Sequence, residues 1–533
     1  MRHRSTSLQL SRFLFAGLLA LALAPVALLA APVATSPAAP RYNVLLIAID
    51  DLNDWVGSFG GSAQTRTPNM DRFCAEGAVA FQNAYCPGPV CGPSRSALLS
   101  GFLPNRTGVY SNTENMRRSV LVQTHATLPE YFAQHGYMTA NRGKIFHKHA
   151  TPEGLDEGQW AFTDWSDTSG RGGVDQAHLY SRLKGIYDGQ KGEAAGKEDN
   201  DVGGDDEGTE FSWGPTKDNK ENTLDWQTAE WAAGQLAQPH AKPFFLAVGI
   251  AKPHLPWYVP QEYFDRHPLD SIKIPEYRLD DLDDILTPDG KKKFSATADF
   301  RWVQKDDLFK RAVQAYLACA SYADDCVGKV LDALAKSPER DHTIVIIFGD
   351  HGWHLGEKLR FRKSTLWQEA TRLPLMIRVP GMTTTRQDSP RIVNLIDLYP
   401  TLIDLCGLPT KAGIDGRVIT PLLRNPQLEW AHPSVTVNGS GNACVRDERW
   451  YFIRYRDGTE ELYDMQQDPM QWTNLARSKD TTALAAKARL AAFFPTQFAP
   501  NIFQDPPKKR LAAKGAAPDL PNPDLKRDLA KLQ

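Results

Sequence analysis

Three short apolar runs constrain the fold of this chain more than any other feature of the sequence. They read YNVLLIAI at 42–49, PFFLAVGI at 243–250 and HTIVIIF at 342–348. Each has the length of a strand and is almost continuously apolar, which is typical of strands buried on both faces. Helical stretches lie between the runs, for example DLFKRAVQAYLACASYADDCVGKVLDALAKS at 307–337. This alternation predicts an α/β fold built on a mostly parallel sheet.

Composition and charge are those of an ordinary globular protein and argue against a nucleic-acid-binding one. The 533 residues suffice for one large domain or two ordinary ones, and 42% of them are hydrophobic. The formal net charge is -2, so no basic field attracts nucleic acid and we expect no nucleic-acid partner. An anionic ligand would therefore need a local basic pocket.

The N-terminus has the pattern of a secretory signal. A basic segment, MRHRSTSLQLSR, precedes the apolar FLFAGLLALALAPVALLA, and small residues follow through Ala34. A membrane anchor is the alternative, but Pro25 and the small residues favour cleavage after a signal peptide at 1–34. We expect an exported protein, periplasmic or secreted, without stable membrane association.

The remaining sequence divides into a main domain and smaller parts. A Gly-rich acidic stretch at 185–214 is expected to form a long surface loop. The pattern changes near residue 429, where alternating residues and an RDG turn predict a small antiparallel sheet. We expect a main domain at 41–428, a C-terminal subdomain at 429–504 and a peripheral tail at 505–533.

The cysteine pattern leaves two readings of Cys91 open. The chain has an odd number of cysteines, so at least one thiol lies outside intramolecular disulfides or is chemically altered. No CxxC pair occurs, which argues against a zinc–thiolate site. The stretch CPGPVC is compatible with a Cys86–Cys91 disulfide.

Acidic residues follow two of the three apolar runs. Asp50 and Asp51 come directly after the first run, and Asp350 and His351 follow the third. Adjacent carboxylates repel unless a cation or solvent screens them. A helix N-cap or a solvated turn would explain the first pair alone. Because parallel strands bring their carboxyl ends to one edge, we favour a site for Ca²⁺ or Mg²⁺.

Basic residues near these positions are candidates for binding an anion. Any one of them alone would be read as an ordinary surface lysine or a core histidine. They occur in RGKIFH, AKPHLPW and FRKSTLW, and the candidates are Lys144, His147, His254 and Lys363.

Cys91 opens the stretch CGPSRSALLSG, with Arg95 four residues later. If this segment is helical, the two side chains share a face, and Cys91 lies at the helix N-terminus, where the dipole favours anions. A cation, basic residues and a nucleophile together suit a tetrahedral anion, sulfate or phosphate.

These motifs resemble the type I sulfatase family. CGPSR matches its Cys-x-Pro-Ser-Arg signature, and IDD, GKIFH, KPHLPW, GDHGWHLGE and RKSTLWQEATRLPL occur in the family's order. The resemblance covers 42–476 and includes the late ELYDMQQDPMQWTNLA. GKIFH and KPHLPW are most similar to the iduronate-2-sulfatase-like branch.

The resemblance implies a fold and an activity. The fold is an alkaline-phosphatase-like α/β/α sandwich with a large, mostly parallel sheet and a smaller C-terminal antiparallel-sheet subdomain, so 41–428 would be the catalytic domain. The activity is hydrolysis of sulfate esters. Export and the GKIFH branch together point to a sulfated carbohydrate, a polysaccharide or a glycosaminoglycan-type oligosaccharide.

The resemblance also implies a modified Cys91. In this family the cysteine is oxidised to formylglycine (3-oxoalanine) by a separate formylglycine-generating maturation enzyme. The hydrated aldehyde carries two hydroxyls on one carbon, so one attacks sulfur and the other expels sulfate.

The same resemblance implies one bound Ca²⁺ per chain and a set of residue roles. The metal ligands would be Asp50, Asp51, Asp350, His351 and an oxygen of modified Cys91; many relatives have Asn in place of this histidine. Arg95 would hold the modified residue and the carboxylates in place. Lys144, His254 and Lys363 would surround the sulfate. Either His254 or Lys363 would protonate the leaving alcohol, and His147 would accept a proton when sulfate is released.

Two alternatives and a set of specificity residues remain as hypotheses. A phosphonate or phosphodiester hydrolase would share the fold and the nucleophile. A catalytically dead glycan-binding relative is disfavoured, because no motif position is substituted. LPWY is expected to offer an aromatic platform for a sugar ring, and the candidates for specificity are His149, Trp257, Tyr258, Trp353, His354 and Arg360.

Overall fold

The computed structural model describes residues 41–147, 162–164, 179–182, 185–186 and 211–502. The expected signal peptide at 1–34 and the tail at 505–533 lie outside these residues. Among the helices of the described ranges, none is long and apolar enough to cross a membrane.

The three apolar runs form adjacent central strands of the main sheet. The first run is β1 (Asn43–Ile49), which pairs in parallel with β8 (Phe244–Ile250) on one side and β10 (Thr343–Gly349) on the other. All residues of the three strands are buried. This confirms the prediction of a mostly parallel sheet whose central strands are covered on both faces.

Within the described residues this sheet has nine strands. The pairs β10–β14, β14–β2 and β13–β2 are antiparallel, and the other pairs are parallel. The remaining strands are β2 (Val79–Tyr85), β3 (Met138–Gly143), β4 (Phe162–Asp164), β13 (Arg372–Leu373), β14 (Leu375–Arg378) and β15 (Gln387–Asn394).

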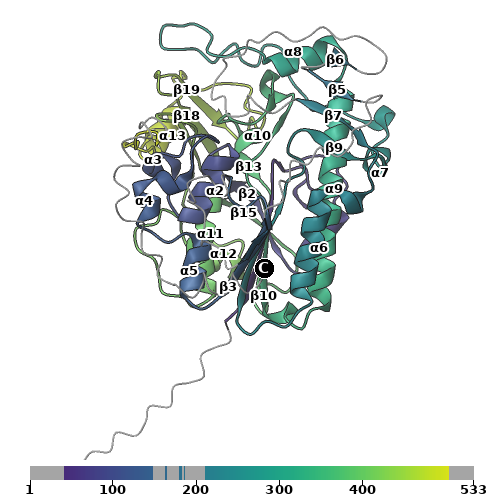
Figure 1. Ribbon diagram of the computed structural model, residues 1–533. Coiled ribbons are helices and arrows are strands. Elements are labelled where there is room, and N and C mark those ends of the chain that lie inside the picture. Colours follow the sequence, from purple (N-terminus) through teal and green to yellow (C-terminus); the bar gives the residue numbers. More distant parts are fainter. Residues whose placement is uncertain (1–40, 148–161, 165–178, 183–184, 187–210, 503–533) are drawn as a thin grey trace, which may run out of the picture. The chain divides into compact units, whose positions relative to one another are not determined.

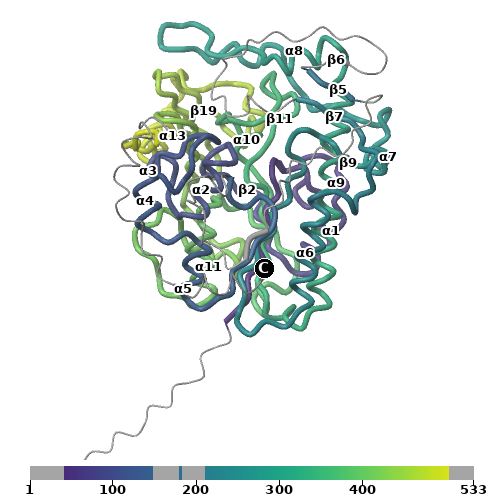
Figure 2. The backbone as a smooth tube through the Cα atoms, viewed as in Figure 1, coloured from purple at the N-terminus to yellow at the C-terminus, as the bar shows by residue number. Residues whose placement is uncertain are grey.

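Alternate residues of β1 pack into two separate hydrophobic cores, because successive side chains of a strand point to opposite faces of the sheet. Leu45, Ile47 and Ile49 belong to the core shared with α6 (Leu224–Leu236) and α9 (Phe309–Lys336). Val44 and Leu46 belong to the core shared with α2 (Cys91–Ser100), α5 (Leu128–Gln134) and α11 (Leu398–Leu405). Figures 1 and 2 show these helix groups on opposite sides of the sheet, which makes the unit an α/β/α sandwich.

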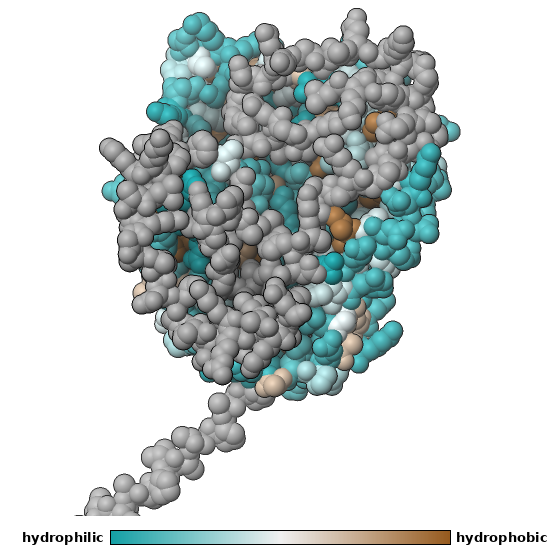
Figure 3. Space-filling view, in the orientation of Figure 1, coloured by the Kyte–Doolittle hydropathy of each residue, from teal (hydrophilic) through white to brown (hydrophobic). Residues whose placement is uncertain are grey.

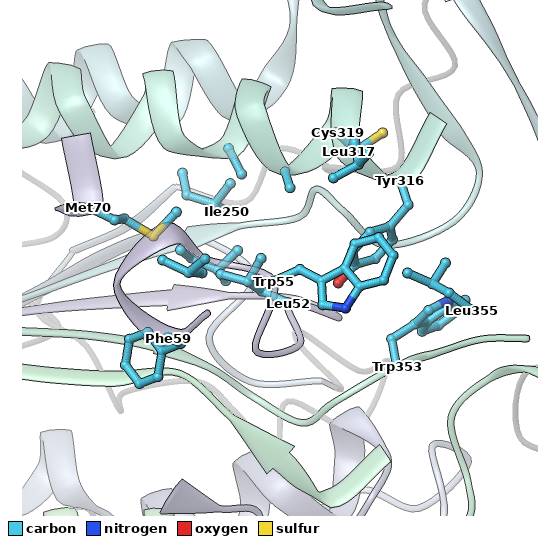
Figure 4. Packing of buried hydrophobic residues seen from close by; sticks show 14 of the residues in the cluster. Leu52, Trp55, Phe59, Met70, Ile250, Tyr316, Leu317, Cys319, Trp353 and Leu355 are labelled. Carbon is cyan, nitrogen blue, oxygen red and sulfur yellow. The ribbon is translucent and has the colours of Figure 1, made fainter. Parts of the chain in front are cut away.

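The long helix α9 (Phe309–Lys336) covers one face and coincides with the predicted helical stretch. Figure 4 shows Leu52, Trp55 and Ile250 packed below Tyr316 and Leu317 of this helix. The other helices are α1 (Pro68–Ala75), α2 (Cys91–Ser100), α3 (Pro104–Thr107), α4 (Val120–Gln123), α5 (Leu128–Gln134), α6 (Leu224–Leu236), α7 (Gln261–Asp265), α8 (Ala298–Lys305), α10 (Gln368–Thr371), α11 (Leu398–Leu405), α12 (Thr420–Arg424) and α13 (Thr481–Ala491).

A small antiparallel sheet follows the main sheet in the chain, as predicted. Its hairpin around Gly458 (φ 86°) corresponds to the RDG turn, and α13 packs on it through a third hydrophobic core. The strands are β16 (Ser434–Val437), β17 (Ala443–Arg446), β18 (Trp450–Arg454) and β19 (Glu460–Asp464). The boundaries of the C-terminal subdomain at 429 and 504 remain a prediction.

The predicted loop at 185–214 is wrong at both ends. β6 (Gly185–Ile186) and β7 (Ser212–Thr216) lie within it or overlap it, and they form a further sheet with β5 (Tyr180–Ser181) and β9 (Trp257–Pro260). The buried Trp213 joins an aromatic cluster with Trp257, so burial overrode the Gly-rich composition there. The middle of the stretch, at 187–210, lies outside the described residues. A two-stranded sheet pairs β11 (His354–Leu355) with β12 (Phe361–Arg362).

The described surface is largely hydrophilic in the view of Figure 3. Its large exposed hydrophobic side chains come from separate parts of the chain: Val120, Ile274, Leu279, Leu428, Leu484 and Phe493.

Candidate active site

The carboxyl ends of adjacent strands bring the predicted polar residues to one edge of the sheet. Asp50 follows β1, Asp350 follows β10, and Lys144 follows β3. The backbone continues the strand pairing here, because Asp50 N–H donates to Ile250 O and Asp350 N–H donates to Ile49 O. Ligands of open α/β sheets bind at this edge.

Cys91 is the first residue of α2, as the sequence predicted. Val90 before it is extended (φ -152°, ψ 146°), and Gly101 ends the helix in the left-handed region (φ 81°). The thiol is fully buried and lies 3.3 Å from His351 Nε2 and 3.3 Å from Lys363 Nζ. All seven cysteines are free thiols, so the structure contains no Cys86–Cys91 disulfide.

Arg95, one helical turn after Cys91, forms ion pairs with two of the carboxylates. Its Nε donates to Asp350 Oδ2 at 2.7 Å, and its Nη2 donates to Asp50 Oδ1 at 3.1 Å. Its Nη1 donates to the carbonyl oxygen of Lys144. One buried guanidinium therefore fixes the ends of three strands relative to one another.

Two lysines complete the charge balance. Lys144 Nζ lies 2.6 Å from Asp50 Oδ2, and Lys363 Nζ lies 2.6 Å from Asp51 Oδ1. The three aspartates are thus matched by Arg95 and the two lysines. A divalent cation added to this set would leave a net positive site, which suits an anionic ester.

His351 presents a ring nitrogen to the same cluster. Its Nδ1 lies 2.9 Å from Gly352 O, and because a carbonyl only accepts, Nδ1 carries the proton. Nε2 therefore offers a lone pair toward Asp51 Oδ1 at 3.4 Å and Asp350 Oδ1 at 3.6 Å. Burial lowers the pKa of His351, which favours this neutral form.

The donor atoms of the cluster fit a metal ion. Ligand atoms of Asp50, Cys91, Asp350 and His351 all lie within 4.8 Å of one another, and a second such group joins Asp50, Asp51, Cys91 and His254. Carboxylate oxygens are the donors that Ca²⁺ and Mg²⁺ prefer, and the imidazole is the one nitrogen donor in the predicted set.

The pKa values follow from burial and from the neighbouring charges. Burial alone would raise the pKa of Asp50, but Lys144, His254 and Arg95 hold it well below its usual range. Burial raises the pKa of the Cys91 thiol far above its usual value, and Asp50 raises it further. An unmodified Cys91 therefore stays a neutral thiol, which is a weak nucleophile.

The two remaining histidines lie in the loops that follow β8 and β3. His254 Nε2 is 4.0 Å from Asp51 Oδ2, and its side chain is 20% exposed. His147 is half-buried, three residues after Lys144. The contacts above join nine of the ten predicted side chains, and His147 is placed beside them by its position in the Lys144 loop.

The backbone is strained at Asp51 and on both sides of Lys363. Asp51 has a φ of 63°, and Arg362 and Ser364, on either side of Lys363, have φ values of 74° and 67°. Non-glycine residues rarely adopt this left-handed region, and such strain is concentrated at functional sites.

Sequence reasoning missed two residues that hold this cluster. Tyr316 of α9 donates its hydroxyl proton to Asp51 O at 2.8 Å and accepts from Asn53 N–H at 3.0 Å. Figure 4 shows Tyr316 beside Trp55. Ser94 donates to Asp350 O at 2.5 Å. Ser94 lies inside the CGPSR motif, but Tyr316 carries no motif signal because it reads as an ordinary core residue of a helix.

The predicted specificity residues are mostly buried. Trp257 is fully buried and its Nε1 donates to Pro253 O at 2.7 Å, so the prediction of a sugar platform at this ring is wrong. Three more are buried: Trp353, His354 and Arg360. Tyr258 is half-buried, with its hydroxyl 2.7 Å from that of Ser212. His149 lies outside the described residues.

Two known family models together match most of the chain. The sulfatase family model matches residues 42–408. A second model, described as the C-terminal part of N-sulphoglucosamine sulphohydrolase, matches residues 349–492.

Individual proteins agree with the family match. A sulfatase of Formosa agariphila is 36% identical over 446 residues, covering 82% of this chain and 83% of its own length. The iduronate 2-sulfatase of Mus musculus is 31% identical, covering 70% of each chain. A solved phosphonate monoester hydrolase from Silicibacter pomeroyi has a TM-score of 0.66 at 20% identity, covering 85% of this chain and 94% of its own, and shows the shared fold. The chain belongs to the sulfatase family.

Proposed function

We propose that this protein is an exported hydrolase of sulfate esters on a carbohydrate, and that it uses formylglycine at position 91 and one bound Ca²⁺. The observation that carries the proposal is the position of Cys91. Its buried Sγ lies at a helix N-terminus, 3.3 Å from Lys363 Nζ and within a cluster of three aspartates. The sulfatase family membership supplies the reaction class.

The proposed cation site uses Asp50, Asp51, Asp350, His351 and residue 91. When bound, Ca²⁺ would polarise the sulfate ester and favour an ionised hydroxyl on residue 91. The hydrated aldehyde supplies a hydroxyl nucleophile together with a second hydroxyl that later releases the sulfate.

The chain's own residues perform the other tasks. Arg95 keeps the carboxylates oriented through its fork of donors. Lys144 and Lys363 place positive charge where the sulfate oxygens bind. His254, whose side chain is partly exposed, protonates the oxygen of the leaving alcohol. His147 accepts the proton of the second hydroxyl on residue 91 when the sulfate leaves.

Three lines support a sulfated sugar as substrate. One relative is named iduronate 2-sulfatase, and the C-terminal family model is described as part of N-sulphoglucosamine sulphohydrolase. The N-terminal sequence has the pattern of a secretory signal. An exported enzyme meets sulfated polysaccharides or glycosaminoglycan-type oligosaccharides outside the cell.

Comparing the turnover of sulfate and phosphorus esters tests the reaction class. Protein co-expressed with a formylglycine-generating enzyme is expected to hydrolyse 4-nitrophenyl sulfate with a kcat/KM at least ~10²-fold higher than phenyl phosphonate or phosphodiester analogues. The reverse preference would identify a phosphonate or phosphodiester hydrolase. Binding of sulfated oligosaccharides without any turnover would identify a glycan-binding relative.

Removing the metal is expected to lower both activity and stability. A ligand at a hundred times its Kd stabilises the folded state by about 2.7 kcal/mol, so chelation by EGTA should lower the melting temperature. Added Ca²⁺ should restore both values in the parent protein but not in Asp350→Asn. An EGTA-treated protein with unchanged activity and unchanged melting temperature would contradict the metal proposal.

A further inference from the structure

Asp225 is a buried carboxylate in the first turn of α6, outside the cluster described above. Both of its oxygens accept hydrogen bonds from the backbone of another segment. Ala251 N–H donates to Oδ1 at 2.8 Å, and Lys252 N–H donates to Oδ2 at 2.9 Å. Ala251 and Lys252 directly follow β8, so this carboxylate fixes the path of the chain where it leaves the sheet.

The anchored segment leads directly to His254. His254 N–H donates to Ala251 O at 2.9 Å, and Lys252 Nζ donates to the carbonyl oxygens of His254 at 3.2 Å and Pro256 at 2.6 Å. The loop is thus stabilised by hydrogen bonds within it, and Asp225 binds its first two residues.

The ring of His254 is oriented by the same loop. Its Nδ1 lies 2.5 Å from Leu255 O, and because that carbonyl accepts, Nδ1 carries a proton. The other ring nitrogen, Nε2, faces Asp51 and lies 4.0 Å from its Oδ2. Lys363 is fully buried against Asp51, whereas the side chain of His254 is 20% exposed. Because His254 is the more exposed of the two side chains, we assign it rather than Lys363 to the leaving oxygen of the substrate.

Burying Asp225 costs free energy that the two backbone hydrogen bonds offset. Burial raises the pKa of Asp225 to about 6, against the lowering effect of the Ala251 and Lys252 N–H groups. A carboxylate at a helix N-terminus usually caps that helix. Here the backbone donors to Asp225 lie on the His254 loop, so its contacts stabilise the loop.

We infer that Asp225 is a positioning residue for His254. It holds the loop so that His254, protonated on both ring nitrogens, gives its Nε2 proton to the leaving oxygen. At the same time the hydroxyl of residue 91 bonds to sulfur and the S–O bond of the ester breaks, so the alcohol departs neutral and His254 is left neutral. The inference rests on the proposed sulfatase function.

The test is the leaving-group dependence of Asp225→Asn. The amide keeps one acceptor oxygen but presents an NH₂ group to the second backbone N–H, so one of the two bonds is lost. An acidic phenol leaves without a proton, whereas an alcohol requires one. The kcat/KM for an alkyl or sugar sulfate is therefore expected to fall at least ~10-fold more than that for 4-nitrophenyl sulfate.

His254→Ala should show the same pattern, and adding Asp225→Asn to it should cause little further loss. The matched control is Asp324→Asn. Asp324 is also a buried carboxylate, and it accepts from the backbone N–H groups of Asn69 and Met70 at 3.0 and 2.8 Å. This control should lower thermal stability but leave the ratio between the two substrates unchanged.

A second readout does not depend on activity. In Asp225→Asn, the amides of Ala251 and Lys252 should exchange with deuterium faster than in the parent, and in Asp324→Asn they should not. Unchanged exchange, or an equal loss on both substrates, would overturn the inference. A parent protein that exchanges as expected but hydrolyses no sulfate ester would instead overturn the proposed function.

Discussion

Cys91→Ala is expected to abolish sulfate ester hydrolysis, with a fall in kcat of at least ~10⁴-fold. Alanine at this position cannot be oxidised to the aldehyde, so the proposed nucleophile is lost. Lys144, Lys363 and the aspartates would remain in place, because the ion pairs Lys144–Asp50 and Lys363–Asp51 do not involve Cys91. Single-turnover and steady-state assays on the sulfate ester measure this effect.

Cys86 provides the matched control for this substitution. It is also a buried free thiol, five residues earlier, and its Sγ lies 3.8 Å from Ala370 O, outside the cluster. Cys86→Ala should retain most of the activity, with a stability loss typical of one small buried side chain. Substantial turnover by Cys91→Ala would show that the cluster acts without a nucleophile at position 91.

Arg95→Met is expected to cause the second largest effect, on both stability and activity. The guanidinium is buried between Asp50 and Asp350 at 3.1 and 2.7 Å. Removing one partner of a buried ion pair costs about 3–5 kcal/mol, because the remaining charges lose their compensation. The same loss would loosen the carboxylates and lower kcat by at least ~10²-fold. Chemical denaturation and steady-state kinetics measure the two effects.

Arg106→Met is the control for Arg95→Met, because it also removes an arginine from an ion pair but does so at the surface. Arg106 Nη1 lies 2.5 Å from Asp415 Oδ1, but the arginine side chain is 39% exposed. Such surface pairs contribute about 0–1 kcal/mol, so this variant should unfold and react almost as the parent does. If Arg95→Met were as stable and as active as Arg106→Met, Arg95 would not organise the site.

The sequence was sufficient to predict the sheet and the edge at which the site lies. β1, β8 and β10 could be recognised because strands buried on both faces are continuously apolar. Their polar ends then had to meet, because parallel strands share a carboxyl edge. The short strands β6 and β7 were missed because their residues are Gly-rich or flanked by acidic residues, and pairing with β5 defines both of them.

The surroundings of the site were harder to predict than the motifs. Trp257 lies in a motif, yet it packs in an aromatic cluster, because the sequence does not show which face of a loop is covered. Asp225 and Tyr316 lie in ordinary amphipathic or apolar helices and act through backbone groups of distant segments. Hydrogen bonds of this kind leave no pattern in the local sequence.

The mass of one tryptic peptide tests the central proposal most directly. Cleavage after Arg72 and Arg95 releases a peptide that contains Cys74, Cys86 and Cys91. In protein matured by a formylglycine-generating enzyme, Cys91 should have lost about 18 Da, whereas thiol oxidation adds mass. The other two cysteines should still react with a thiol-specific alkylating reagent. A peptide with three alkylated cysteines, from protein that hydrolyses the sulfate ester, would contradict the account.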